Sequence, residues 1–250
     1  MMASLSSWFA LLRSIIIYHG NRERHRRMDA LYAQFVKPGD LVFDIGAHVG
    51  DRIASFRRLG ARVVALEPQP GPAVILQFLF GHDRAITLLR EAAAGKEGEL
   101  PLHVNSRNPT VSTISDDFVR AAQGAQNWEG QCWDGVIAVP TTTLDVLIKT
   151  YGNPAFIKID VEGYEQVVLS GLTTPVPALS FEFTTIARAV AIACLDRLKA
   201  IGDYRYNVSL GESQTFVFPS SVTAEEMRFY LRDVPHLANS GDVYAHRLSA

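Results

Sequence analysis

Short apolar runs alternate with stretches of helical periodicity from Val36 onward. The apolar runs predict strands over residues 41–45, 62–66, 85–89, 156–161 and 179–183, with added strands over 100–104 and 136–139. The periodic stretches between them predict helices over residues 52–59, 72–80, 143–151, 165–172 and 186–201. Strands and helices that alternate in this way are typical of an α/β domain with a mostly parallel sheet.

Two segments depart from this alternation. Residues 204–210 and 214–218 predict a terminal antiparallel hairpin around Gly211-Glu212, whereas a plain dinucleotide-binding fold ends on parallel strands. Residues 105–134 are rich in Ser, Thr, Asn, Gln and Gly and show no period. An irregular stretch of that length inside a compact domain is usually functional or disordered.

Residues 1–35 predict a helical extension ahead of an α/β domain at 36–250. Arg13 interrupts its apolar run, which fits neither a signal peptide nor a membrane span. We expect the helix to pack on the α/β domain. Because a basic cluster follows it, peripheral contact with an anionic membrane surface is the alternative. The apolar stripe consists of Leu5, Trp8, Phe9, Leu12, Ile15 and Ile16, and the basic cluster of Arg22, Arg24, His25, Arg26 and Arg27.

Composition limits the classes of protein to consider. The 250 residues fit one large α/β domain, and 48% of them are hydrophobic, which is enough to bury a sizeable core. Lys and Arg number 24 against 26 for Asp and Glu, so we expect no nucleic acid partner. Cys132 and Cys194 form no CxxC motif, which favours a reducing, cytoplasmic location but leaves a disulfide between them open. The histidines lack the spacing of a zinc site, and no metal is predicted.

A glycine-rich turn, Asp44-Ile-Gly-Ala-His-Val-Gly50, follows the first predicted strand. Such a turn lets the backbone approach a ligand outside the carboxyl end of a strand. Its spacing is G-x-x-x-G rather than G-x-G-x-x-G, with an acidic residue before Gly46. This difference favours the methionyl end of S-adenosylmethionine over a pyrophosphate. The backbone from Gly46 through Ala47 and His48 to Gly50 would contact the carboxylate, with Asp44 near the ammonium and sulfonium.

Glu67-Pro68 ends the second predicted strand. An acidic side chain there can accept hydrogen bonds from both ribose hydroxyls of a nucleoside. Enzymes that use NAD place an acid similarly, so this position alone leaves an NAD-dependent oxidoreductase as an alternative.

A charged row follows the strand predicted at 156–161. Strand alternation puts Lys158, Asp160 and Glu162 on one side, and the neighbouring strand adds Glu182. Charges at the mouth of a buried strand are costly unless they meet ligands or partners. We therefore expect Asp160, Glu162 and Glu182 to converge on a reacting group, with an ion-pair network around Lys158 as the structural alternative.

Together these segments resemble the FkbM family of methyltransferases over roughly residues 40–185. The resemblance implies a class I methyltransferase Rossmann-like fold, with a mostly parallel seven-stranded sheet and an antiparallel end. It also implies S-adenosylmethionine as cofactor and methyl transfer to a hydroxyl of a sugar, glycolipid or other natural product. The family often has Asn where His48 stands. The matching segments are Asp44–Gly50, Glu67-Pro68, Ala93-Ala-Gly95 with Gly98, Thr143-Leu-Asp145, Lys158–Gly163 and Ser180-Phe-Glu182.

The expected roles follow from an alcohol acceptor, which needs a base or a metal. Asp160 or Glu182 would accept the hydroxyl proton, Glu162 would orient the acceptor, and His48 is a second candidate base. The three acids could instead gather a divalent cation. Ser112, Thr113 and Ser115 are further candidate contacts. A non-catalytic binding module remains the other alternative, and the sequence does not indicate the oligomeric state.

Overall fold

The computed structural model describes residues 5–248, and the side chains from residue 11 onward. Its main sheet has seven strands in the order β3-β2-β1-β7-β8-β10-β9. The pairs from β3 to β8 are parallel, and β10 runs antiparallel to both of its neighbours. The predicted fold, a mostly parallel seven-stranded sheet with an antiparallel end, is thereby confirmed. The strands are β1 (Leu41–Ile45), β2 (Arg62–Leu66), β3 (Ile86–Leu89), β7 (Phe156–Ile159), β8 (Ala178–Thr184), β9 (Tyr204–Leu210) and β10 (Ser240–Arg247).

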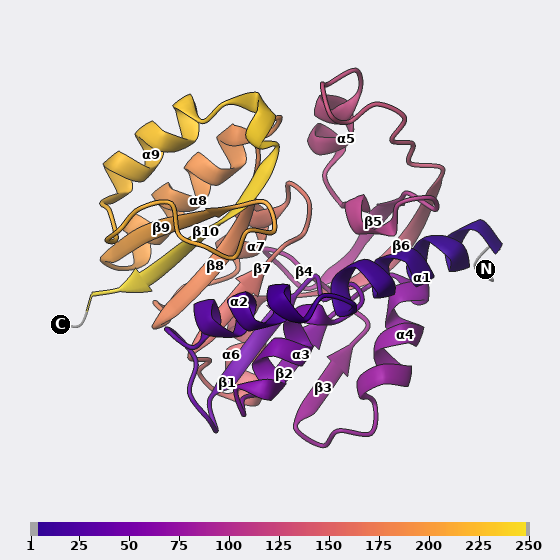
Figure 1. The fold of residues 1–250 in the computed structure, drawn as a ribbon, viewed down its shortest axis with the longest axis horizontal. Coiled ribbons are helices and arrows are strands. Elements are labelled where there is room, and N and C mark those ends of the chain that lie inside the picture. Colours follow the sequence, from indigo (N-terminus) through magenta and orange to yellow (C-terminus); the bar gives the residue numbers. More distant parts are fainter. Residues whose placement is uncertain (1–4, 249–250) are drawn as a thin grey trace.

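Helices cover both faces of this sheet (Figure 1). Successive residues of a strand point to opposite faces, so Val42 of β1 joins the apolar cluster under α2, α3 and α4, whereas Phe43 joins the larger cluster under α6, α7, α8 and α9. Both faces are therefore buried, as the continuous apolar runs of the strands require. The helices are α2 (Arg22–Tyr32), α3 (Asp51–Arg58), α4 (Pro70–Phe80), α6 (Leu144–Tyr151), α7 (Glu165–Ser170), α8 (Arg188–Ile201) and α9 (Ala224–Asp233).

The partner of β9 differs from the one predicted. Residues 214–218 form no strand and make a single antiparallel bridge, Ser209 with Phe216, whereas β9 pairs along its whole length with β10. Helix α9, which begins with a capping box at Thr223, lies between the two strands in sequence. The hairpin prediction was wrong in its second strand because β10 carries a buried acidic residue, Asp242, that masks its apolar pattern.

A second sheet, in the order β4-β6-β5, lies beside the main one. It consists of β4 (Ala92–Ala93), β5 (Gly98–Val104) and β6 (Gly135–Thr142). The predicted irregular stretch 105–134 connects β5 to β6 and contains only the short helices η1 (Pro109–Val111) and α5 (Asp116–Ala122). The ring of Phe118 packs edge-on against Trp128 at a centroid distance of 5.1 Å, which gives this stretch an apolar cluster of its own.

The N-terminal helix α1 (Leu5–His19) packs on α4, and of the stripe predicted for it Ile15 contacts the cluster that includes Ile75. Leu11 is 1% exposed and clusters with Ile75 of α4, whereas Leu12 and Ile16 of the predicted stripe are 54% and 72% exposed. The side chains of Leu5, Trp8 and Phe9 lie outside the described part. Helix α2 buries more of its side chains against the domain than the described part of α1 does, and its Tyr32 is fully buried. No helix within residues 5–248 is long and apolar enough to cross a membrane.

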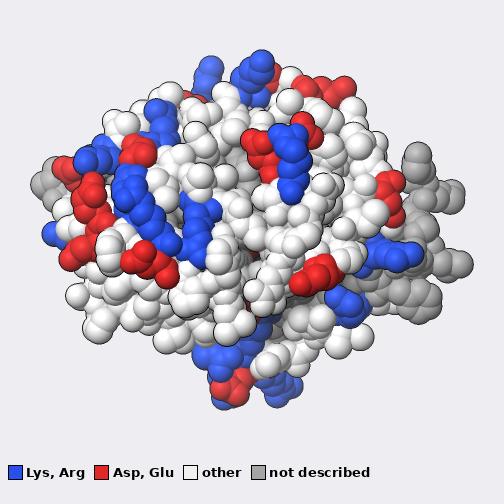
Figure 2. All heavy atoms as spheres, turned by 90° about the horizontal axis from the view of Figure 1, so that it is seen from above, with Lys and Arg blue, Asp and Glu red and all other residues white. Residues whose placement is uncertain are grey.

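The surface carries both signs of charge. Figure 2 shows acidic and basic side chains interspersed over the face seen from above.

Cys132 is exposed and Cys194 is buried, and both are free thiols, so the disulfide that the sequence left open does not form.

Candidate active site

A cleft of about 630 Å³, its open mouth included, lies at the carboxyl ends of β1, β2 and β7. This is the edge at which parallel α/β sheets bind ligands. The cleft brings together residues from five parts of the chain that the sequence singled out or left irregular. Its walls include Gly46, His48, Glu67, Pro68, Gln69, Ala93, Ser112, Thr113, Asp160, Glu162 and Tyr164.

The glycine loop, residues 44–50, is held against the neighbouring strands. Gly46 has φ +84°, and a Cβ on it would lie 1.9 Å from the carbonyl oxygen of Asp160. The N–H groups of Gly46 and Ala47 both donate to the carbonyl of Leu66, at 3.0 and 2.9 Å. Gly50, with φ +80°, is the N-cap of α3. Neither Ala47 nor Gly50 lines the cleft, so these two residues shape the loop rather than its surface.

Asp44 lies on β1 behind the cleft and not in its wall. Its carboxylate is completely buried, and neither oxygen has a hydrogen-bond partner among the described residues. Burial raises the pKa of Asp44 to about 7, although the register neighbour Lys158 opposes the shift. An unpartnered buried carboxyl of this kind is rare in proteins and is a candidate for a functional role.

Glu67 lines the cleft directly after β2. One carboxylate oxygen accepts the N–H of His48 and the other the N–H of Gln69, both at 2.8 Å. A carboxylate has about four acceptor sites, so each oxygen keeps capacity for a further donor from the cleft. Burial raises the pKa of Glu67 to about 7.

The strand β7 ends at Ile159, two residues before its predicted end, because the chain then turns sharply. Glu162 has φ +56°, a strained value for a residue with a side chain. The turn is held by Glu165, a residue that the sequence did not single out. Its carboxylate accepts the N–H groups of Val161 and Gly163, at 3.0 and 3.2 Å.

Asp160, Glu162 and Glu182 converge as predicted, with one carboxylate oxygen of each within 4.8 Å of the others. We call these three residues the acidic cluster. Glu182 does not line the cleft, and one of its oxygens is buried without a partner among the described residues. The ion pair between the Lys158 ammonium and the Asp160 carboxylate, the structural alternative of the sequence, is present as well.

The protonation of the acidic cluster is uneven. Burial would raise the pKa of Asp160, but the adjacent Lys158 ammonium outweighs burial and holds this pKa below its ordinary value. Burial and the charge of Asp160 raise the pKa values of Glu162 and Glu182 well above the ordinary range. Asp160 is therefore the carboxyl of the cluster that ionises most readily, whereas Glu162 and Glu182 hold a proton more readily than an ordinary glutamate does.

His48 lines the cleft, and its side chain is buried beside Tyr18, near the C-terminal end of α1. Its Nε2 has no hydrogen-bond partner among the described residues, and its ring lies edge-on to Tyr18 at a centroid distance of 5.9 Å. Burial lowers the pKa of His48 to about 4, so the imidazole is neutral at physiological pH. Tyr18 was not predicted as a neighbour of the site, because a single tyrosine on an apolar helix has no distinguishing spacing.

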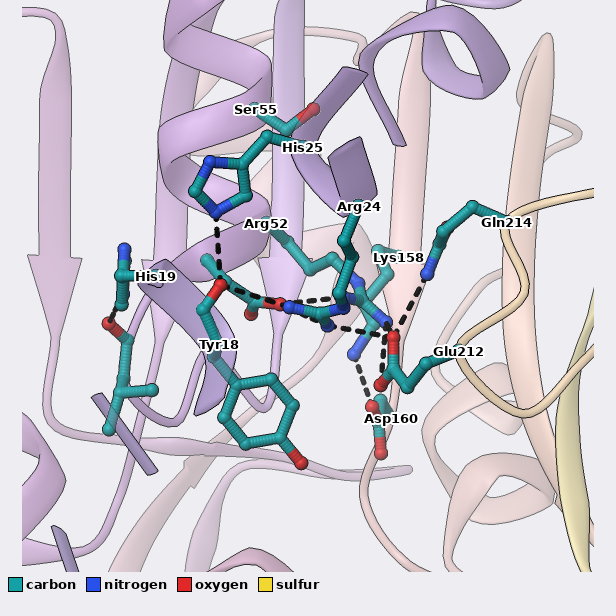
Figure 3. Close-up of polar contacts among 12 residues, drawn as sticks. Tyr18, His19, Arg24, His25, Arg52, Ser55, Lys158, Asp160, Glu212 and Gln214 are labelled. Carbon is teal, nitrogen blue, oxygen red and sulfur yellow. Dashed lines mark hydrogen bonds and ion pairs between the residues drawn. The ribbon is translucent and has the colours of Figure 1, made fainter. Parts of the chain in front are cut away.

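Charged residues from distant segments tie α2 to the glycine loop (Figure 3). The Arg24 guanidinium donates to Asp51, the first residue of α3, at 2.8 Å and to Glu212 at 2.7 Å. Arg52 donates to the same two carboxylates. Arg24, Asp51 and Arg52 are each at most 8% exposed, so this network is buried apart from Glu212.

Other residues of the family resemblance, and candidate contacts from the irregular stretch 105–134, have structural roles. Thr143 caps α6 by accepting the N–H of Val146 at 3.1 Å, and Asp145 accepts both the N–H and the hydroxyl of Thr173. Ser115 caps α5, whereas the Thr113 hydroxyl donates to the carbonyl of Glu162 at 2.7 Å and so holds the acidic turn.

Comparison with solved structures finds methyltransferases that align over most of this chain. A TehB-like SAM-dependent methyltransferase from Corynebacterium glutamicum is 9% identical, with a TM-score of 0.50, over 97% of this chain and 98% of the other. A SAM-dependent O-methyltransferase from Thermotoga maritima is 12% identical, with a TM-score of 0.45, over 90% and 65% of the two chains. A precorrin-6Y C5,15-methyltransferase from Geobacter metallireducens is 12% identical, with a TM-score of 0.45, over 88% of each chain. No curated protein sequence matches the chain.

The family profile is the more specific finding. The methyltransferase FkbM domain matches residues 44–233, which include the glycine loop, Glu67 and the whole acidic cluster. The seven-stranded order of the sheet agrees with the class I methyltransferase fold that the resemblance implied. The chain therefore belongs to the FkbM family of methyltransferases.

Proposed function

We propose that this chain transfers the methyl group of S-adenosylmethionine to a hydroxyl oxygen of a sugar, glycolipid or other natural product. The observation that carries the proposal is the juxtaposition, in one cleft, of Glu67 with the ionised carboxylate of Asp160. The Glu67 carboxylate can accept hydrogen bonds from the ribose hydroxyls of the cofactor. The Asp160 carboxylate can accept the proton that the acceptor hydroxyl must lose. The proposed location is the cytoplasm, since Cys132 and Cys194 are both free.

The residues present fit the cofactor at two points. Glu67 offers unused acceptor capacity to two ribose hydroxyls, and Pro68 and Ala93 provide apolar wall beside it. Asp44 offers a buried carboxyl without a partner near the glycine loop, which suits an ammonium group. Once bound, S-adenosylmethionine supplies an electrophilic methyl group on a sulfonium. Gly46 and His48, the two loop residues that line the cleft, would lie beside its methionyl end, and Ala47 and Gly50 would shape the loop behind them.

Asp160 is the residue we assign as proton acceptor. It lines the cleft, and its pKa is held low by Lys158, so its carboxylate is ionised at neutral pH. A weak base suffices because a hydroxyl becomes strongly acidic as its oxygen bonds to the methyl carbon. Alignment of the acceptor then supplies much of the acceleration.

The other candidates take supporting roles. Glu162 lines the cleft, and its raised pKa favours the protonated form, which can donate a hydrogen bond that orients the acceptor. Glu182 does not line the cleft, so we assign it as a positioning residue beside Asp160 rather than as the base. The neutral imidazole of His48 remains a second candidate base.

The test is transfer of labelled methyl from S-adenosylmethionine into fractionated extract of the source organism, followed by chemical identification of the labelled bond. We expect label as a methyl ether in a glycan, glycolipid or secondary-metabolite fraction. Asp160→Asn should abolish transfer while still binding S-adenosylhomocysteine. The control Asp196→Asn, on a side chain that is 60% exposed, should retain transfer. Label on nitrogen or carbon, or full turnover by Asp160→Asn, would overturn the proposal.

A further inference from the structure

The outer face of α1 is apolar and uncovered. Leu12, Ile16 and Ile17 are 54%, 72% and 52% exposed, whereas Leu11 and Ser14 on the inner face are buried against the domain. Soluble proteins rarely expose several large aliphatic side chains on one helix, and such a patch usually marks an interaction site.

The neighbouring helix extends the apolar character. Helix α4 packs on α1 and contains no charged residue, and its Val74 and Phe78 are 45% and 83% exposed. Over its described length, α1 carries no acidic residue, and Arg13 is its one Lys or Arg. Two adjacent helices therefore present large apolar side chains with almost no charge between them.

The charges beside this surface are positive. Arg13 on α1 and Arg22 and Arg26 on α2 are exposed, and none of them pairs with an acidic side chain among the described residues. The nearby acids are already engaged, since Glu23 pairs with Arg27 and Asp29 with Arg58. An apolar helix face flanked by free arginines is complementary to a surface of acyl chains and phosphate headgroups.

We propose that the outer face of α1 docks on an anionic lipid bilayer, with Leu12, Ile16 and Ile17 entering the acyl boundary and Arg13, Arg22 and Arg26 contacting headgroup phosphates. A second copy of the chain is the less suitable occupant, because a symmetric contact would bring the same unpaired arginines of both copies together. The inner face of α1 carries Tyr18 against His48, so the bound membrane would lie about one helix diameter, roughly 10 Å, from the cleft.

Vesicle binding by the full-length chain tests this surface. We expect the chain to co-sediment with vesicles of equal parts phosphatidylcholine and phosphatidylglycerol, more strongly than with pure phosphatidylcholine, and less strongly at high salt. The double substitution Leu12→Ser with Ile16→Ser should lower the partition coefficient at least about tenfold. Arg22→Glu with Arg26→Glu should remove the preference for the anionic vesicles.

Matched controls distinguish binding through this surface from nonspecific adsorption of the protein to vesicles. Phe229→Ser with Leu237→Ser changes two apolar side chains that are 69% and 82% exposed elsewhere, and Arg84→Glu with Arg90→Glu changes two other arginines outside this surface. Both controls should bind vesicles as the wild type does. The substituted positions on α1 and α2 are all exposed, so the thermal unfolding midpoints should agree with that of the wild type.

Three outcomes would overturn the proposal. The wild type could fail to bind anionic vesicles, or the Leu12 and Ile16 variant could bind them as well as the wild type. Alternatively, analytical ultracentrifugation could show that the Leu12 and Ile16 substitutions dissociate a dimer that has no affinity for vesicles, which would make a second copy the occupant. None of these readouts depends on methyl transfer.

Discussion

The backbones of Gly46 and Asp160 lie so close together that a Cβ on Gly46 would be 1.9 Å from the Asp160 carbonyl oxygen. The N–H of Asp160 in turn donates to the carbonyl of Ile45 at 3.0 Å. The loop proposed to hold the cofactor and the turn that carries the proposed base are thereby fixed relative to each other. A side chain at Gly46 would have to separate them.

We therefore expect Gly46→Ala to lower the free energy of unfolding by about 2 kcal/mol or more and to abolish binding of S-adenosylhomocysteine. Gly39→Ala is the matched control, because Gly39 has φ +88° but nothing lies within 4 Å of the position that a Cβ would take. Gly39→Ala has the same conformational cost as Gly46→Ala but no steric clash. It should therefore be less destabilised than Gly46→Ala and bind S-adenosylhomocysteine as the wild type does. Equal effects of the two substitutions would show that the contact with Asp160 does not matter.

Asp44 should make stability depend on pH. Its pKa is raised from 3.8 to about 7, so the folded chain keeps a proton that the unfolded chain releases. The folded state binds more protons between these values, and stability falls as pH rises from about 4 to about 7. In Asp44→Asn, the loss of unfolding free energy between pH 5 and pH 8 should shrink by roughly 2 kcal/mol in urea titrations. The surface control Asp196→Asn should keep the wild-type dependence, and an unchanged dependence in Asp44→Asn would refute the assignment.

The acidic cluster should work without a metal ion. Its oxygens are close enough to hold a divalent cation, but the Lys158 ammonium already pairs with Asp160, and the raised pKa values of Glu162 and Glu182 disfavour the ionised forms that a cation would need. We expect EDTA to leave methyl transfer unchanged and added Mg²⁺ to have no effect. If EDTA removes turnover and Mg²⁺ or Mn²⁺ restores it, the cluster is a cation site instead.

Arg24 should anchor α2 to the glycine loop. Its side chain is 7% exposed and pairs with Asp51, so Arg24→Met leaves buried acceptors short of a partner. Because Arg52 still pairs with Asp51, we expect a loss of about 2 kcal/mol of unfolding free energy, less than for a buried pair broken outright. Arg27→Met, which breaks an exposed pair with Glu23, should cost less than about 0.5 kcal/mol. Similar losses in both variants would argue against the anchor.

The parts of the site that the sequence predicted consist of short runs of residues that are adjacent in the sequence. Asp44 to Gly50, Glu67 and Lys158 to Glu162 each lie at or just after the end of a buried parallel strand, so the end of each strand fixes where its residues must lie. Because β1 lies between β2 and β7, these three strand ends meet without further information.

The parts that the sequence missed depend on contacts between distant segments. Glu212 lies 188 residues from Arg24, and no local pattern links them. Strand β10 was missed because Asp242 breaks its apolar alternation. That residue is tolerated in the interior because the charges of Lys158 and Arg52 partly offset the rise that burial causes in its pKa. The buried face of α1 was predicted only in part, with Ile15 but without Leu11, because α4, which packs against Leu11, is far away in sequence.

Titration calorimetry with S-adenosylhomocysteine tests most directly whether the cleft at Glu67 binds the cofactor. We expect saturable binding by the wild type and a loss of about tenfold or more in affinity for Glu67→Gln, because one acceptor oxygen is replaced by an NH2 group that cannot accept a ribose hydroxyl. The exposed control Glu97→Gln should bind as the wild type does. Equal affinity in Glu67→Gln, or binding of NADH in place of S-adenosylhomocysteine, would contradict the proposed cofactor site.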